Sequence, residues 1–160
     1  MVLTWRGMAV ADLPAVEALA ASMHPHHPEA AAVFAERLSL APQGCWVLAG
    51  PAGLAGYALS HPWTGTTAPP LDTLLGALPA RPGAWHIHDI ALLPEARGAG
   101  HAAAILRHLL AILPWATLVA IPGTGAYWTR QGFADATVAD APALASYGAG
   151  ARFMARAPPS

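Results

Sequence analysis

The hydrophobic pattern is most regular between residues 85 and 113, where it predicts a strand, a turn and a helix in succession. Residues 85–93 are mostly apolar and predict a strand, which Pro94 ends because proline has no amide N–H to donate to a sheet. A turn with Gly98 and Gly100 follows, and Pro114 closes the helix after it. The apolar positions of that helix recur at helical spacing: Ile105, Leu106, Leu109, Leu110 and Leu113.

Strict alternation along the strand at 85–93 divides its side chains between the two faces of a sheet. One face carries His86, His88, Ile90 and Leu92, and the other carries Ile87, Asp89, Ala91 and Leu93. The two histidines then project in the same direction, about 7 Å apart by strand rise, so that both could line one tunnel. Asp89 points to the opposite face and is interpreted as a structural residue.

Shorter patterns on either side predict the remaining elements. Antiparallel strands at 45–49 and 54–60 are joined by a hairpin, and a long proline-rich connection follows at 61–83. The strand at 117–121 runs parallel to the one at 85–93, because a helix crosses between them. The other predicted elements are a strand at 3–6, a helix capped by Asp12, a helix starting near 28–29, a helical turn at 71–78, a short helix ending at 131–133, and strands at 134–139 and 152–155.

Length and composition favour a single folded domain over residues 1–160. The chain is 55% hydrophobic and 11% charged, which is typical of a globular protein and not of a disordered one. Its formal net charge of -1 offers no basic field for nucleic acid, and prolines and glycines interrupt the uncharged stretch at 39–71, so neither a nucleic-acid nor a membrane partner is expected. Cys45 is the only cysteine and lies in an apolar run, which favours a buried strand thiol and a cytoplasmic protein.

The glycine-rich turn before the helix indicates a site for an anion. A turn of small residues that feeds a helix N-terminus exposes several backbone N–H groups, and the helix dipole favours negative charge there. A dinucleotide fingerprint would require a third glycine where Ala103 stands and an acidic residue about twenty positions later. The next acidic residue after the helix is Asp135, so the turn favours a phosphate site of another kind.

Arg97-x-x-Gly100-x-Ala102 matches the pyrophosphate-binding pattern Gln/Arg-x-x-Gly-x-Gly/Ala of the GNAT superfamily of acetyl-CoA-dependent N-acetyltransferases. The stretch from Tyr127 to Phe133 resembles the second signature of these enzymes, Phe-Tyr-x-x-x-Gly-Phe, and the order of the predicted elements agrees. The resemblance implies a mixed α/β (α+β) fold. It has a mostly antiparallel sheet of six to seven strands, splayed at its one parallel pair and flanked by about four helices.

A narrower resemblance concerns the strand itself. His86-Ile87-His88-Asp89-Ile90-Ala91-Leu92 is similar to the His-Leu-His-x-Leu-Ala-Val strand of the serotonin (arylalkylamine) N-acetyltransferases. It implies transfer of an acetyl group from acetyl-CoA to the primary amine of a small molecule, with an arylalkylamine as one candidate, by direct attack assisted by a histidine base. Two alternatives stay open: acetylation of a protein or peptide amine, and a non-catalytic CoA-binding regulatory module. Both a monomer and a homodimer are compatible with the sequence.

The resemblance also implies roles for individual residues. His86 and His88 would provide the base, since a histidine with a pKa of about 6.5 is suited to take the proton of an amine. Trp128 stands where many family members have the tyrosine that protonates the leaving thiolate, so the adjacent Tyr127 is the candidate acid. The residues implied in acetyl-CoA binding are Ile90, Ala91, Leu92, Arg97, Gly98, Ala99, Gly100, His101, Ala102, Ala103 and Trp128.

The remaining histidines and tryptophans are less informative. His24, His26 and His27 lack the spacing of a zinc site, so no metal is expected and an exposed loop near the acceptor entrance is favoured. Aromatic residues on both sides of the long connection are expected to shape an acceptor pocket for an amine with an apolar body: His61, Trp63 and Trp85.

Overall fold

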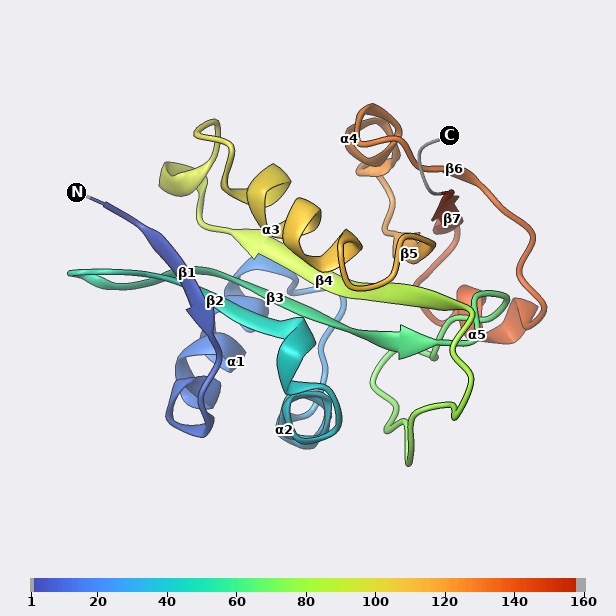
Figure 1. Cartoon of the computed structure of the whole chain (residues 1–160), viewed down its shortest axis with the longest axis horizontal. Coiled ribbons are helices and arrows are strands. Elements are labelled where there is room, and N and C mark those ends of the chain that lie inside the picture. The colour runs from blue at the N-terminus through green and yellow to red at the C-terminus, as the bar shows by residue number, and fades with distance from the viewer. Residues whose placement is uncertain (1, 158–160) are drawn as a thin grey trace.

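The computed structural model describes residues 2–157, which form one open sheet with helices on both faces (Figure 1). Seven strands follow the order β1-β2-β3-β4-β5-β7-β6, and all neighbours are antiparallel except β4 and β5. The mixed fold with one parallel pair, expected from the sequence, is confirmed. The strands are β1 (Thr4–Gly7), β2 (Cys45–Gly50), β3 (Gly53–Trp63), β4 (Ala84–Leu92), β5 (Ala116–Ala120), β6 (Ala134–Asp135) and β7 (Arg152–Arg156).

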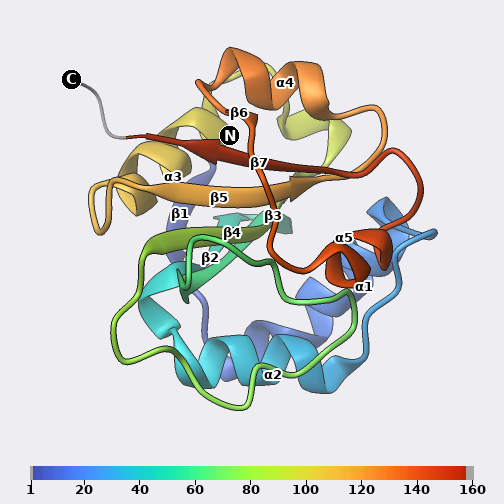
Figure 2. The same ribbon diagram turned by 90° about the vertical axis from the view of Figure 1, so that its right-hand side faces the viewer.

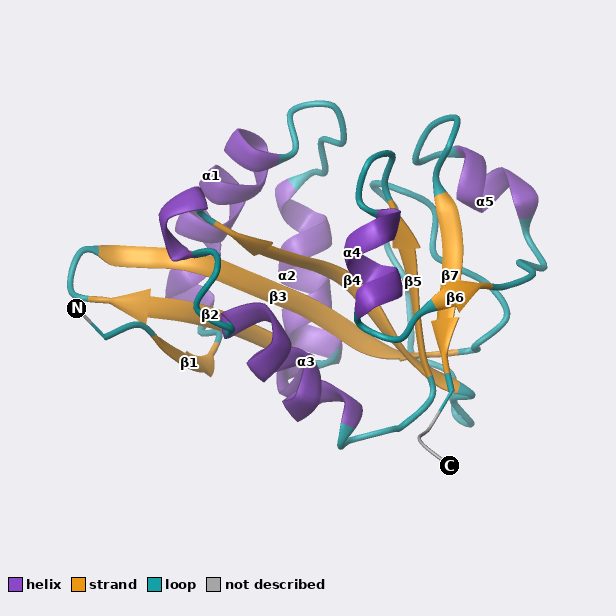
Figure 3. Ribbon diagram, turned by 90° about the horizontal axis from the view of Figure 1, so that it is seen from above, coloured by secondary structure: helices purple, strands orange, loops and turns teal. Residues whose placement is uncertain are grey.

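Helices cover the two faces of the sheet unequally. In the view of Figure 2, α1 and α2 lie below the sheet and α3 and α4 above it, and Figure 3 shows α3 crossing over the strands. None of the helices of residues 2–157 combines the length and apolar character needed to cross a membrane. The helices are α1 (Leu13–Met23), α2 (Ala31–Leu40), α3 (His101–Leu110), α4 (Gly125–Arg130) and α5 (Ala141–Ala145).

Each face of the sheet has its own apolar core. Leu106 and Leu109 of α3 pack with Leu118 of β5, while Phe34 of α2 packs with Tyr57 of β3 on the opposite face. The helical spacing of the α3 leucines explains this arrangement, because residues three apart project from the same side of a helix. The rigid sheet between the two cores positions the ends of β4 and β5.

The parallel pair separates along its length. The register of β4 and β5 runs only from Trp85 opposite Ala116 to Ile87 opposite Leu118, although β4 continues to Leu92. Beyond Ile87 the edge of β4 that faces β5 has no strand partner among the described residues. The sheet is therefore open between these two strands.

A β-bulge interrupts β4 beside this opening. Leu59 of β3 pairs with Asp89, but Ser60 pairs with Ile87, so His88 is an extra residue in the ladder. Strict alternation was the wrong prediction here, because an extra residue shifts the side chains beyond it to the other face. Ile87 and Ile90 accordingly pack in the same core.

Several local predictions also differ from the structure. Asp12 does not cap α1 with its side chain; it accepts the Ala9 N–H at 2.8 Å and pairs with Arg6 at 2.8 Å. Residues 71–78 contain a turn at Leu71 and Asp72 but no helix, since backbone N–H groups there are bonded to side chains of other segments. The strand expected at 134–139 shortens to β6, and α5 follows where no helix was expected.

Candidate active site

A cavity of about 730 Å³ occupies the opening between β4 and β5. Its walls come from the outer half of β4, from β5, from the turn before α3 and from α4. At its other end the walls come from three segments that are distant in sequence: the loop after α1, the connection between β3 and β4, and the tail of α5. The residues from these three segments are Met23, His24, His27, Glu29, Leu71 and Tyr147.

The turn before α3 presents a row of unbonded amides at one end of the cavity. Gly98 and Gly100 both have φ +85°, a conformation that glycine adopts without strain. The first helical hydrogen bond runs from the Ala104 N–H to the Gly100 carbonyl at 3.0 Å. Within residues 2–157, none of the six amides from Gly98 to Ala103 donates to another protein group. This arrangement favours an anionic ligand.

The residues expected to bind a cofactor gather around this turn. All of them line the cavity except Ala99. Arg97 is oriented by its Nε, which donates to the Leu92 carbonyl at 3.1 Å, and the side chain is exposed. The unpaired edge of β4 at Ile90–Leu92 runs from the turn toward the other end of the cavity.

His86 and His88 have different surroundings. His86 is 1% exposed, and its Nδ1 is hydrogen-bonded to the Thr117 hydroxyl at 2.9 Å. It does not line the cavity, and burial lowers its pKa well below the ordinary value, so the ring is neutral. His88 does line the cavity. The expectation that both histidines face one tunnel is therefore met only by His88.

Glu29 is the partner of His88 in the cavity wall. His88 Nε2 lies 2.7 Å from Glu29 Oε1, and the two side chains are 2% and 9% exposed. Burial opposes ionisation of Glu29, but the hydrogen bond to His88, together with nearby positive charge and the Asp72 amide, holds its pKa below the ordinary value. Glu29 is thus an ionised carboxylate that accepts a hydrogen bond from His88. The sequence pattern gave no reason to pair these two residues.

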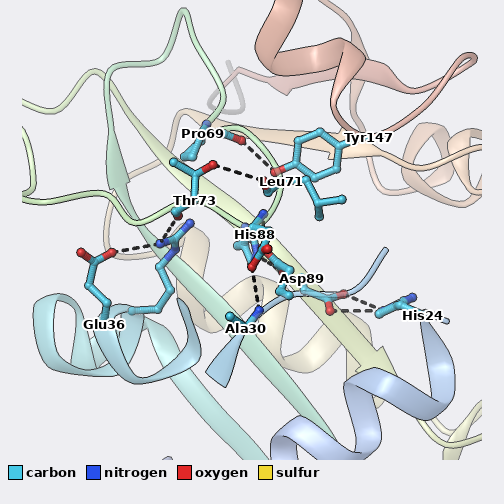
Figure 4. A network of polar contacts seen from close by, with 12 residues as sticks. His24, Ala30, Glu36, Pro69, Leu71, Thr73, His88, Asp89 and Tyr147 are labelled. Atoms are coloured by element: carbon cyan, nitrogen blue, oxygen red, sulfur yellow. Dashed lines mark hydrogen bonds and ion pairs between the residues drawn. The ribbon is translucent and has the colours of Figure 1, made fainter. Parts of the chain in front are cut away.

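Asp89 lines the same cavity as His88, so its predicted orientation is wrong, whereas its interpretation as a structural residue is not contradicted. The bulge turns it toward α1, where His24 Nε2 lies 3.2 Å from its Oδ1 (Figure 4). The Tyr57 hydroxyl donates to its Oδ2. Burial opposes its ionisation, but the hydrogen bond and charge of His24 and the Tyr57 hydroxyl hold the pKa of Asp89 below its ordinary value. The hydrogen bond to Asp89 in turn raises the pKa of His24.

This pair predicts a stability effect that depends on pH. Because the pKa of His24 is raised, its contribution to the free energy of unfolding is complete below about pH 6.5. That contribution is lost as the pH rises through the raised pKa. Asp89, whose pKa is lowered, contributes to the free energy of unfolding above about pH 4 and loses this contribution only in stronger acid. His24→Gln is therefore expected to lower the free energy of unfolding by about 1 kcal/mol at pH 5.5 and by less at pH 9. Urea unfolding at both pH values measures this, with the exposed His26→Gln as control. Equal losses at both pH values would refute the ion pair.

Helix α4 brings two aromatic residues to the cavity. Tyr127 and Trp128 both line it, with ring centroids 5.0 Å apart, and Trp128 packs edge-on against Phe133 at 5.6 Å. Burial raises the pKa of the Tyr127 hydroxyl, so that group keeps its proton at neutral pH. Trp128 has only an indole N–H, which is not a useful acid.

Other residues singled out in the sequence lie elsewhere. His61, Trp63 and Trp85 do not line the cavity: Trp85 packs in the core beneath α3, and burial lowers the pKa of His61 to about 3. Cys45 is buried, and its burial raises the thiol pKa to about 12. No group of three or more His, Cys, Asp or Glu side chains in residues 2–157 is arranged to hold a metal ion.

Comparison with known proteins gives a family match and several similar folds. Residues 10–117 match the model of the Acetyltransferase (GNAT) family, whereas no curated protein sequence matches. The GNAT-like decarboxylase GphF in complex with isobutyryl-CoA has a TM-score of 0.76 at 17% identity, over 96% of this chain and 98% of that one. Naa20 of Chaetomium thermophilum in complex with a bisubstrate analogue has a TM-score of 0.72 at 15% identity, over 97% and 86%. N-acetylglutamate synthase from Neisseria gonorrhoeae, complexed with CoA and N-acetyl-glutamate, has a TM-score of 0.72 at 15% identity, over 98% of this chain and 35% of that one.

Proposed function

The chain belongs to the acetyltransferase (GNAT) family, and from that premise we propose that it transfers the acetyl group of acetyl-CoA to the primary amine of a small molecule. One observation carries the proposal. A single cavity has five residues with unbonded amides at one end and a buried histidine–carboxylate pair at the other, with the open edge of β4 between them. The first end suits a diphosphate, and the second suits an amine that must lose a proton.

The cofactor half needs no metal. The backbone amides from Gly98 to Ala103 bind the pyrophosphate of CoA, assisted by the N-terminal dipole of α3. The open edge of β4 at Ile90–Leu92 offers backbone groups to the pantetheine arm. Relatives of this fold have been solved with CoA or isobutyryl-CoA, which supports the same cosubstrate here.

The acceptor half suits a small amine with an apolar body. The carboxylates of Glu29 and Asp89 give this end negative charge, whereas Met23, Leu71 and Tyr147 add apolar surface. An alkylamine has a pKa of about 10 and arrives as an ammonium ion, which the carboxylates favour. An arylalkylamine has both features.

The loops around the acceptor end are bonded to one another, which supports a compact acceptor over a peptide. His27 Nε2 lies 2.8 Å from the Tyr147 carbonyl. The Tyr147 hydroxyl donates to the Pro69 carbonyl at 2.8 Å (Figure 4). The Leu71 N–H donates to the Ser146 hydroxyl at 2.8 Å. These bonds join the loop after α1, the β3–β4 connection and α5 around the cavity.

The chemistry follows from the two ends. Acetyl-CoA supplies a thioester, and the amine nitrogen forms a bond to its carbonyl carbon as the carbon–sulfur bond breaks. His88 takes the proton that the ammonium must lose before attack. Tyr127, which keeps its proton at neutral pH, donates it to the leaving thiolate. The second proton, which the nitrogen loses as it becomes an amide, returns to Tyr127 through solvent. Trp128 lines the cofactor side and does not transfer a proton.

A panel of amines tests the proposal. We expect release of the CoA thiol from acetyl-CoA with phenethylamine or tryptamine between pH 6 and 9, and much slower release with spermidine or a peptide N-terminus. Phenethyl alcohol, which has the same body without the amine, is the control. Turnover restricted to the peptide would replace the small-molecule acceptor by a protein one. Tight acetyl-CoA binding without turnover on any amine would instead favour a regulatory module.

A further inference from the structure

The connection between β3 and β4, residues 64–83, contains no helix or strand but is bonded to the active site. The amides of Leu75 and Gly76 donate to the Glu36 carboxylate at 2.6 and 3.0 Å. The Thr73 carbonyl accepts from the buried Arg37 at 3.1 Å (Figure 4). These bonds attach the connection to α2. They give a fixed position to Asp72, which lies between the bonded residues.

Asp72 and the residues before α2 are joined by two hydrogen bonds, one donated from each side. The Asp72 N–H donates to Glu29 Oε2 at 3.0 Å, and the Ala30 N–H donates to Asp72 Oδ1 at 2.6 Å. Asp72 has φ +56°, in the left-handed region that aspartate tolerates better than most residues. The other Glu29 oxygen accepts from His88 at 2.7 Å. Both oxygens of Glu29 are therefore committed, one to the connection and one to His88.

This geometry defines which nitrogen of His88 exchanges protons. A carboxylate can only accept hydrogen bonds, so Nε2 of His88 carries the hydrogen that Glu29 accepts. In the neutral ring the lone pair then lies on Nδ1. His88 Nδ1 is buried and has no hydrogen-bond partner within residues 2–157. It is the nitrogen that can gain or lose a proton without breaking the bond to Glu29.

We propose that Glu29, hydrogen-bonded to Asp72 of the β3–β4 connection, is the positioning residue of the base: it holds His88 as the Nε2–H tautomer and leaves the lone pair on Nδ1. The proposal rests on the proposed acetyl transfer. It gives the long connection a role, because Asp72 aligns the carboxylate that aligns the histidine. The carboxylate–histidine arrangement is one that orients imidazole bases generally.

The tautomer can be measured without turnover. Long-range ¹H–¹⁵N spectra of histidine-labelled protein distinguish Nε2–H from Nδ1–H, and His88→Asn identifies the His88 signals. We expect the Nε2–H pattern in the wild-type protein and a mixture of tautomers in Glu29→Ala. The same variant is expected to lose kcat about tenfold or more while the KM for acetyl-CoA stays unchanged.

A matched pair at Asp72 separates positioning from folding. Asp72→Asn keeps an oxygen acceptor for Ala30 and tolerates positive φ, whereas Asp72→Gly adopts positive φ freely but loses the acceptor. We expect similar melting temperatures, a kcat near the wild-type value for Asp72→Asn, and a kcat lowered severalfold for Asp72→Gly, with weakening of the Nε2–H signal.

Two outcomes distinguish failure of this proposal from failure of the proposed function. Wild-type turnover combined with an unchanged tautomer and kcat in Glu29→Ala would overturn the positioning role alone. A wild-type protein that acetylates no amine but shows the Nε2–H tautomer, lost in Glu29→Ala, would overturn the acetyl transfer and retain the pairing of Glu29 with His88.

Discussion

Replacing His88 by asparagine is expected to lower kcat/KM for the amine by about 100- to 10,000-fold, the range that a general base contributes. His88 is the strand histidine that lines the cavity, and it is bonded to an ionised Glu29. Asparagine has no basic nitrogen and cannot take the proton of the ammonium. Thiol release measured at saturating acetyl-CoA gives the loss, and calorimetry is expected to show unchanged affinity for CoA.

His86→Asn is the matched control, because it changes the same residue type two positions away on the same strand. The buried His86 contacts Thr117 and not the cavity, so activity is expected to stay within about threefold. Stability is expected to fall by about 1 kcal/mol, because the Thr117 hydroxyl loses a buried partner. If the folded His86 variant were as inactive as the His88 variant, the base would be a pair of histidines and not His88 alone.

The order of helices and strands was predictable because it depends on local periodicity. The helical spacing of Ile105, Leu106 and Leu109 needs no distant partner to be recognised, and all three are buried against the sheet. The bulge at His88 was not predictable, because an extra residue leaves the apolar character of a strand unchanged. It reversed the predicted orientation of Asp89 and gave the two strand histidines different surroundings.

The two ends of the site also differed in how far they could be predicted from the sequence. The amide-rich end is built from consecutive residues around Gly98 and Gly100, so its geometry could be inferred from a short motif. The acceptor end is assembled from Glu29, Leu71 and Tyr147, which are more than 40 residues apart along the chain. No pattern in the sequence indicates that these three segments meet, and Glu29 and Asp89 were therefore not recognised as charges of one cavity.

The proline-rich connection was predictable only in its length. It has no periodic apolar positions, and its order comes from bonds to side chains of α2 and α5. The buried Arg37 shows the difficulty: an arginine on a helix is expected at the surface, yet it is 0% exposed and holds the Thr73 carbonyl. Tertiary contacts of this kind determine the position of Asp72.

Replacing Ala102 by glutamate is expected to weaken acetyl-CoA binding by about thirtyfold, which corresponds to about 2 kcal/mol. Ala102 lies in the first turn of α3 and lines the cavity beside the unbonded amides. A carboxylate there repels the pyrophosphate and competes for the same N–H groups. Calorimetric titration with CoA measures the loss of affinity.

The same substitution should not destabilise the fold, because negative charge in the first turn of a helix interacts favourably with the helix dipole. Stability and affinity are thus expected to change independently: the melting temperature is retained or raised while CoA affinity falls. Ala102→Gln is the control, since it has nearly the same size without the charge, and it should weaken binding only severalfold. An equal loss of affinity in both variants would mean that the side chain merely obstructs the cavity. A full retention of affinity in Ala102→Glu would show that the anion does not bind at these amides.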